Sequence, residues 1–248
     1  MNPVTSGPTG GHCALKVSGL GVVLSSFTLQ PVSFDVAAGE IVGFLGDNGA
    51  GKTTTLRLIM GLTRPDRGSA MVGSFDHVLD EPAFKARVGF VPEQIHFYAK
   101  MQVGGLLEFV SGFYDRWDEQ YCRDLLERFH LASTKRIEEL SKGMQTKLAL
   151  VVALAHRPDI LLLDEPTSGL DPTSRLALLR LLDEAAHRDG CGVLISSHDI
   201  AEVDRLADRI IIIHAGAIRL NERVADLRAE CTPVTAWSLE NVFMGAIQ

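Results

Sequence analysis

The sequence predicts an α/β protein with a mixed, largely parallel β-sheet at its core and a helical segment inserted into it. The first observation is a set of short apolar runs that end in polar or glycine-rich turns, at residues 41–45, 160–163, 193–196 and 210–213. Uninterrupted runs of this kind are typical of strands buried on both faces. Helical patterns follow them, as expected for strand–helix–strand units. A buried turn of helix could give the same run, but the run lengths and the flanking glycines favour strands.

Two helices are signalled next to these strands. Residues 52–60 form the helix after the first strand. The helix after Asp171 has clear start signals, because Asp171 suits the N-cap and Pro172 suits the first helical position, where its missing N–H costs nothing. The apolar residues that then recur at helical spacing are Leu176, Leu179, Leu182 and Ala186.

The middle of the chain, about residues 95–158, has a different pattern. Four apolar residues recur at i, i+4, i+5 and i+8, and they are Tyr121, Leu125, Leu126 and Phe129. Residues 142–156 are also helix-like. We therefore expect a helical subdomain inserted between two halves of the sheet.

Composition limits the class of protein. With 248 residues, 46% hydrophobic and 22% charged, the chain matches an ordinary globular protein with one substantial core. We expect a mobile tail over residues 1–11, which are rich in Gly, Pro, Ser and Thr, and a single domain over residues 12–248. The net charge of −7 argues against nucleic acid as a partner.

Two further classes are disfavoured. No apolar run approaches the roughly 20 residues of a membrane-spanning helix. The cysteines show no metal-binding or CxxC spacing and are predicted to be reduced and incidental; they are Cys13, Cys122, Cys191 and Cys231.

A phosphate-binding loop is predicted directly after the first strand. The segment fits G-x-x-x-x-G-K-[ST] and opens the predicted helix, and its residues are Gly46, Asp47, Asn48, Gly49, Ala50, Gly51, Lys52, Thr53 and Thr54. The glycines allow successive N–H groups to point at a phosphate at a helix N-terminus. Lys52 would reach the β- and γ-phosphates of ATP, and the Thr53 hydroxyl would bind Mg²⁺. A glycine turn that only caps a helix is the alternative, which the strand and helix around it disfavour.

Two adjacent carboxylates, Asp164 and Glu165, follow the apolar run 160–163. Carboxylates at the end of a buried strand are costly unless a cation or a positive partner is present. Asp164 would hold Mg²⁺ through water, and Glu165 would act as the general base that polarises the attacking water. A solvated turn after a strand is the alternative for this dipeptide alone.

Six pieces of sequence occur in one order: GDNGAGKTT, Gln94 after FVPE, LSKGMQ, LLLDEP, SGLD and Ser197-His198. In order and spacing they resemble the ATP-binding subunit of an ABC transporter, over about residues 15–216. The resemblance implies a P-loop NTPase fold with an N-terminal antiparallel β-subdomain beside the mixed sheet.

The resemblance also implies roles for further residues. Ser141 and Gly143 match the family's signature loop, which binds the γ-phosphate held by the opposite subunit. Gln94 matches the glutamine that senses Mg²⁺ and the attacking water, and His198 matches the histidine that contacts the γ-phosphate. Residues 168–171 would cross a dimer interface.

By the same resemblance, the chain would bind ATP with Mg²⁺ and pair with a second ATPase subunit, as a homodimer or a heterodimer. It would drive an integral membrane subunit from the cytoplasmic face of the cell membrane. The transported substance is chosen by that membrane subunit and is not written in this sequence.

The sequence departs from the family pattern at two places. In the signature, Lys142 stands where the family usually has a second glycine, and a methionine stands at Met144. This variant resembles that of exporter-type ATPases. Residues 238–243 resemble the closing motif of the same branch, although an ordinary amphipathic terminal helix would give the same pattern. Export is therefore the expected direction. The aromatic residue that usually contacts adenine is missing, since Val23 stands at the ungapped position, and Phe27 could replace it.

Three alternatives remain at this stage. The first is a soluble relative acting in translation or DNA repair. Such proteins usually have two fused ATPase halves or a long coiled coil, and this sequence shows neither. An unrelated phosphate-loop kinase or GTPase would not need LSKGMQ or His198. A non-enzymatic subunit with a degenerate site is disfavoured by the intact Lys52, Asp164, Glu165 and His198.

Overall fold

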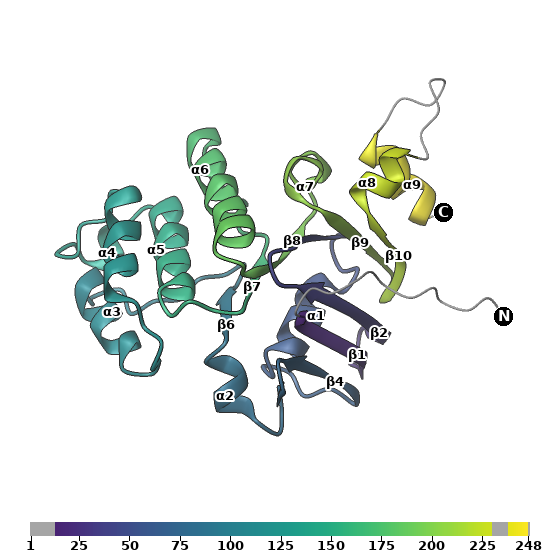
Figure 1. The fold of residues 1–248 in the computed structure, drawn as a ribbon, viewed down its shortest axis with the longest axis horizontal. Coiled ribbons are helices and arrows are strands. Elements are labelled where there is room, and N and C mark those ends of the chain that lie inside the picture. The colour runs from purple at the N-terminus through teal and green to yellow at the C-terminus, as the bar shows by residue number, and fades with distance from the viewer. Residues whose placement is uncertain (1–12, 230–237, 248) are drawn as a thin grey trace.

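The computed structural model describes residues 13–229 and 238–247, and it contains two β-sheets flanked by helices (Figure 1). The predicted tail at residues 1–11 lies outside the described residues, as does Cys231. Among the described residues, none of the helices combines the length and apolarity that a membrane span requires.

The larger sheet has six strands in the order β10-β9-β3-β8-β7-β6. All neighbours pair in parallel except β9 and β10, so the sheet is mixed, as predicted. Its strands are β3 (Ile41–Leu45), β6 (Val88–Val91), β7 (Ile160–Asp164), β8 (Gly192–Ser197), β9 (Arg209–His214) and β10 (Ala217–Arg223). The four apolar runs expected to be strands lie within β3, β7, β8 and β9, so those predictions are confirmed.

The smaller sheet is antiparallel, with the order β2-β1-β4-β5. Its strands are β1 (Cys13–Val23), β2 (Thr28–Ala37), β4 (Arg67–Val72) and β5 (Phe75–Asp76). Along β2, buried and exposed residues alternate, which is typical of a strand with one face against a core. The antiparallel N-terminal sheet expected from the family resemblance is therefore present.

Strand β7 shows why the large sheet needs cover on both faces. Leu161 and Leu163 pack into the core formed with the helices of the middle segment, whereas Ile160 and Leu162 pack into the core shared with the antiparallel sheet. Successive side chains of a strand point to opposite faces, so an uninterrupted apolar run fills two cores at once.

Helix α1 (Lys52–Ile59) lies between the two sheets, with Leu56, Leu58 and Ile59 fully buried (Figure 1). The short helix α2 (Glu81–Lys85) leads into β6.

The middle segment is helical, as expected. It contains α3 (Val103–Ser111), α4 (Glu119–Arg128), a 3-10 turn at Ile137–Glu139 and α5 (Lys142–Leu154). Figure 1 shows these helices together on one side of the molecule. Leu125 and Phe129 are buried in their shared core, and Tyr121 and Leu126 pack against it. Three residues of the predicted stripe therefore lie on one face of α4, and the fourth, Phe129, directly follows the helix.

Helix α6 (Pro172–Asp183) begins as predicted, because the Asp171 carboxylate accepts hydrogen bonds from the N–H groups of Thr173 and Ser174 at 3.0 Å. Its buried face differs from the predicted stripe. Leu182 and Ala186 are buried, but Leu176 is 50% exposed, and Leu178 and Leu181 face the core in its place. The buried residues of α6 recur at i, i+4, i+7 and i+8, so Leu176 lies on the opposite face of the helix; they are Ser174, Leu178, Leu181 and Leu182.

The C-terminal part forms a third, smaller core. Helices α7 (Ile200–Leu206), α8 (Val224–Ala229) and α9 (Leu239–Ile247) pack beside β9 and β10. Leu239 and Phe243, from the motif noted at residues 238–243, are buried here against Val203 of α7. The motif therefore has a packing role within the chain.

Candidate active site

The phosphate-binding loop connects the end of β3 to the start of α1 and depends on its glycines. Gly49 and Gly51 have φ of 81° and 117°, a region that residues with a side chain rarely adopt. A Cβ atom at Gly46 would lie 2.5 Å from the backbone oxygen of Ile213. The loop therefore keeps its backbone close to β9 and presents N–H groups at a helix N-terminus, where a phosphate is favoured.

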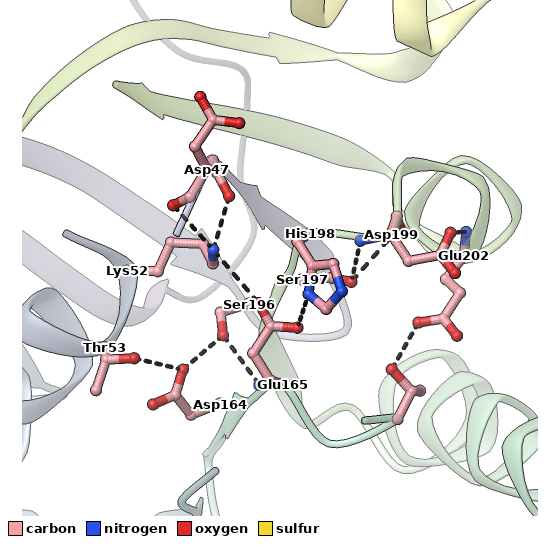
Figure 2. A network of polar contacts seen from close by, with 12 residues as sticks. Asp47, Lys52, Thr53, Asp164, Glu165, Ser196, Ser197, His198, Asp199 and Glu202 are labelled. Atoms are coloured by element: carbon pink, nitrogen blue, oxygen red, sulfur yellow. Dashed lines mark hydrogen bonds and ion pairs between the residues drawn. The ribbon is translucent and has the colours of Figure 1, made fainter. Parts of the chain in front are cut away.

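Lys52, the first residue of α1, is 6% exposed and points back over this loop (Figure 2). Its Nζ donates to the backbone oxygen of Gly46 at 2.7 Å and more weakly to that of Asp47 at 3.4 Å. Nζ also lies 3.3 Å from Oε1 of Glu165. That contact is an ion pair without the geometry of a hydrogen bond, so Oε1 of Glu165 is a buried acceptor with no hydrogen bond. Lys52 thus joins the loop to β7.

The adjacent carboxylates Asp164 and Glu165 face different partners. Asp164 ends β7 and is 2% exposed, and its Oδ1 accepts from Thr53 Oγ1 at 3.2 Å and from Ser196 Oγ at 2.7 Å. Glu165 has a φ of 49°, which turns the chain sharply after the strand. One carboxylate therefore meets the Thr53 hydroxyl, and the other meets Lys52.

Ser196 was not singled out from the sequence, yet it holds both carboxylate residues in place. Parallel pairing sets Ser196 of β8 opposite Asp164 of β7. Its hydroxyl donates to Asp164 and accepts from the backbone N–H of Glu165 at 3.0 Å. A hydroxyl residue at the end of an otherwise apolar strand is the available sequence signal, but its partner is known only once the strand order is known.

His198 follows β8 and lies beside Glu165, with 2.8 Å between Nδ1 of His198 and Oε2 of Glu165 (Figure 2). The histidine is 60% exposed, whereas the side chain of Glu165 is 9% exposed. Glu165 is therefore held between Lys52 on one side and His198 on the other. An aqueous reactant could reach this pair from the His198 side.

Gln94 lies at the same edge of the sheet as these residues. It stands three residues after β6, which pairs in parallel with β7, and its side chain is exposed. Within the part of the chain that the structure describes, no hydrogen bond or ion pair joins Gln94 to Thr53, Asp164 or Glu165. Its expected role in the site remains a prediction.

Ser141 and Gly143 lie away from the phosphate-binding loop. Ser141 is the N-cap of α5, where its Oγ accepts from the N–H of Met144 at 3.3 Å. Figure 1 shows α5 on the other side of β6 and β7 from α1. A Cβ atom at Gly143 would lie 3.4 Å from Cδ2 of Leu170, so the start of α5 packs against residues 168–171 of the same chain.

The two candidates for an adenine contact differ in position. Val23 is 60% exposed, and its N–H donates to Asp66 at 2.7 Å. The ring of Phe27 is directed at the phosphate-binding loop, since Cζ of Phe27 would lie 2.9 Å from a Cβ atom at Gly51. Phe27 therefore borders the loop, whereas most of Val23 faces solvent.

This arrangement agrees with the comparison with known families. Residues 29–168, more than half of the chain, match the family model described as "ABC transporter". The chain belongs to the ABC transporter family. Relatives that match it are named ABC transporter ATP-binding proteins.

Two ABC relatives illustrate the similarity. The chain is 38% identical over 183 residues to the ABC transporter ATP-binding protein YtrB of Bacillus subtilis, covering 73% of this chain and 62% of YtrB. It is 38% identical over 191 residues to the Nod factor export ATP-binding protein I of Paraburkholderia xenovorans, covering 75% of this chain and 62% of that relative. The chain thus spans less than two thirds of the length of either protein.

Solved ABC structures share the fold. The ATP-binding subunit of an ABC transporter superposes with a TM-score of 0.85 at 29% identity, covering 94% of this chain and 99% of that chain. A dimeric bacterial ABC transporter cassette, MJ0796, gives a TM-score of 0.75 at 24% identity over 85% of this chain and 98% of that chain, a likeness of fold. The predicted fold class, with a mixed sheet and an antiparallel N-terminal sheet, is confirmed.

Proposed function

We propose that this chain is the ATP-hydrolysing subunit of a transporter whose membrane-spanning part is a separate polypeptide. The observation that carries the proposal is the position of Glu165 between Lys52 and His198, at 3.3 Å and 2.8 Å. A largely buried carboxylate with one oxygen, Oε1, free of hydrogen bonds and the other, Oε2, beside a histidine suits the acceptance of a proton from water.

The residues present fit the triphosphate of ATP. Residues 46–54 offer N–H groups at a helix N-terminus, with no side chain at Gly49 or Gly51 to obstruct a phosphate. Lys52 supplies a positive charge beside them and would shift from Glu165 toward the β- and γ-phosphates. Phe27, at the border of the loop, is the candidate for contact with the base.

The residues present also fit Mg²⁺. The Thr53 hydroxyl and the Asp164 carboxylate, 3.2 Å apart, are hard oxygen donors of the kind that Mg²⁺ prefers, with the remaining ligands supplied by phosphates and water. Gln94 is proposed to join them. The ion would neutralise charge on the phosphates. Ser196 holds Asp164 in the orientation that this requires.

In the proposed mechanism, Glu165 is the general base and takes a proton from the attacking water onto its carboxylate. A positioned general base contributes about 10²–10⁴-fold to a rate. His198 orients the carboxylate through its 2.8 Å contact and would also contact the γ-phosphate.

A second ATPase subunit, identical or not, is part of the proposal. Ser141 and Gly143 lie at the N-terminus of a helix of 13 residues, α5, which Figure 1 shows on the other side of β6 and β7 from α1. We infer that they bind the ATP of the partner, and that residues 168–171 cross the interface. ATP would hold the two subunits together, and hydrolysis would separate them.

We further propose that the membrane subunit is driven from the cytoplasmic face and that transport is export. Export is supported by the LSKGMQ signature and by the likeness to a Nod factor export protein. Isolation of the chain from detergent-solubilised membranes should recover an integral membrane protein. Recovery of ribosomes or DNA-repair proteins instead would favour a soluble ABC ATPase.

The test of hydrolysis is Glu165→Gln. The variant should bind ATP, hydrolyse it at least 100-fold more slowly and elute as an ATP-bound dimer in size-exclusion chromatography. Glu222→Gln, at an exposed position on β10, is the matched control and should behave as the wild type. Normal turnover by Glu165→Gln would reject Glu165 as the general base.

A further inference from the structure

A buried hydrogen bond lies behind the Glu165–His198 pair. Thr167 Oγ1 donates to Oε2 of Glu202 at 2.7 Å. Thr167 and Glu202 are only 4% and 6% exposed. Figure 2 shows Glu202 beside Asp199, on the other side of His198 from Lys52. Neither side chain has a part in the proposed chemistry, although a buried carboxylate is costly to maintain.

Arg175 of α6 balances the charge of Glu202. Its Nε lies 2.8 Å from Oε1 of Glu202, and its Nη1 lies 3.5 Å from Oδ2 of Asp199. Asp199 is the N-cap of α7 and accepts from the N–H groups of Ala201 and Glu202 at 3.1 and 3.3 Å. The contacts of Glu202 therefore fix α7 against α6 and against the segment after β7.

Two short segments are joined twice by these contacts. Residues 165–167 follow β7, and residues 198–202 follow β8. The first connection is Glu165 to His198 at 2.8 Å, and the second is Thr167 to Glu202 at 2.7 Å. A single contact would leave the segments free to rotate about it, whereas two contacts fix both their spacing and their orientation.

We propose that Glu202 and Thr167 are positioning residues for ATP hydrolysis, holding Glu165 and His198 in register through this second connection. The inference rests on the proposed function, because it assigns a purpose to the geometry of Glu165. The hydrogen bond between Thr167 and Glu202 also anchors residues 168–171, which follow Thr167 and pack against the start of α5.

The central experiment compares Thr167→Val with Thr167→Ser. Valine keeps the shape of threonine and removes the hydroxyl, whereas serine keeps the hydroxyl. Thr167→Val should lower kcat by roughly 100-fold, the scale of a misplacement of about 1 Å, and leave the Kd for ATP unchanged, because Lys52 and its loop are untouched. Thr167→Ser should restore kcat to within about threefold of the wild type on the same reasoning.

Glu202→Gln separates the hydrogen bond from the charge. The amide oxygen still accepts from Thr167, but Arg175 loses its buried partner. We expect a smaller fall in kcat than in Thr167→Val and a larger loss of stability in urea. The matched control is Glu40→Gln, which removes the charge from the partly buried pair between Glu40 Oε1 and Arg209 Nε, 2.8 Å apart and outside the site. Glu40→Gln should lose stability and keep the kcat of the wild type.

A readout without turnover distinguishes this inference from the proposed function. The imidazole NMR signals of His198 should shift in Thr167→Val, while those of His214 stay in place. A folded Thr167→Val protein with wild-type kcat and unchanged His198 signals would overturn the inference. A wild-type chain that hydrolyses no ATP would count against the proposed function. In that case the shift of the His198 signals between the wild type and Thr167→Val would still test whether Thr167 positions His198.

Discussion

Glu165 and His198 follow neighbouring parallel strands and lie 2.8 Å apart, measured from Oε2 of Glu165 to Nδ1 of His198. Their strands are in a register that sets Asp164 opposite Ser196. Each residue therefore begins its loop at the same edge of the sheet, and the contact between them does not depend on a long flexible connection.

The first prediction concerns His198. In His198→Asn the carboxylate of Glu165 loses its imidazole partner, so kcat for ATP should fall by about 100-fold with little change in KM. His130→Asn is the control, since His130 is exposed, distant in sequence, and has a φ of 54° that asparagine tolerates. Steady-state ATPase assays measure both. Equal activity of the two variants would remove His198 from the mechanism.

The second prediction concerns the base of the nucleotide. Phe27 borders Gly51, whereas Val23 is 60% exposed. Phe27→Ala should weaken ATP binding by about 1–3 kcal/mol, the scale of a base stacked on an aromatic ring. Val23→Ala should leave the Kd unchanged. Fluorescence titration with a labelled nucleotide measures both, and a loss confined to Val23→Ala would reverse the assignment.

The third prediction concerns Gly169, which has a φ of 75° and would place a Cβ atom 3.2 Å from Nζ of Lys142. Gly190 has a φ of 78° with open space around it, so it reports backbone strain alone. Both alanine variants should lose about 1–2 kcal/mol of unfolding free energy in urea. Only Gly169→Ala also displaces Lys142, so only this variant should lose ATPase activity. Lys142→Ala should reproduce part of that activity loss, and full activity in both glycine variants would contradict the prediction.

The fourth prediction concerns stability in acid. Burial lowers the pKa of His156 to about 4, only partly offset by the backbone of Val152 and Val88, and its ring stacks on Tyr114 at 4.0 Å. The folded chain holds His156 neutral, while the unfolded chain protonates it near its ordinary pKa of about 6.5. The stabilising contribution is therefore complete above pH 6.5 and is lost as the pH falls toward 4, by up to about 3 kcal/mol.

Urea unfolding at pH 7.5, 6 and 5 measures this effect. His156→Phe keeps the stacked ring and removes the titrating group. The stability of the wild type relative to His156→Phe should fall as the pH is lowered, and a constant difference across this range would reject the assignment.

The strands of the large sheet were predictable because they are buried on both faces, which leaves a continuous apolar run in the sequence. The phosphate-binding loop was predictable because steric limits at Gly46 and Gly51 leave few alternatives. The first two strands were not located from residue patterns. Bulges in β1 interrupt the alternation of buried and exposed residues. The sequence therefore shows neither a continuous apolar run nor a regular apolar–polar alternation there.

The contacts of Ser196, Thr167 and Glu202 could not be predicted from the sequence. Thr167 and Glu202 are 35 residues apart, and their contact depends on β7 and β8 being neighbours. In the sequence, Glu202 has the appearance of a surface residue on an amphipathic helix. Leu176 shows the opposite case, because an apolar residue at helical spacing faces solvent.

The strand order also determines which length changes the site tolerates. The loops carrying Lys52, His198 and Glu165 leave β3, β8 and β7, three neighbours in the sheet, so the separation of about 4.8 Å between strands sets the distances between these loops. Residues added or removed between α3 and α5 would leave this spacing intact. One residue inserted within β8 would instead move His198 by about 3.3 Å along the strand and turn the side chains after it to the opposite face. Natural variation in length should therefore accumulate in the helical segment and be absent from β8.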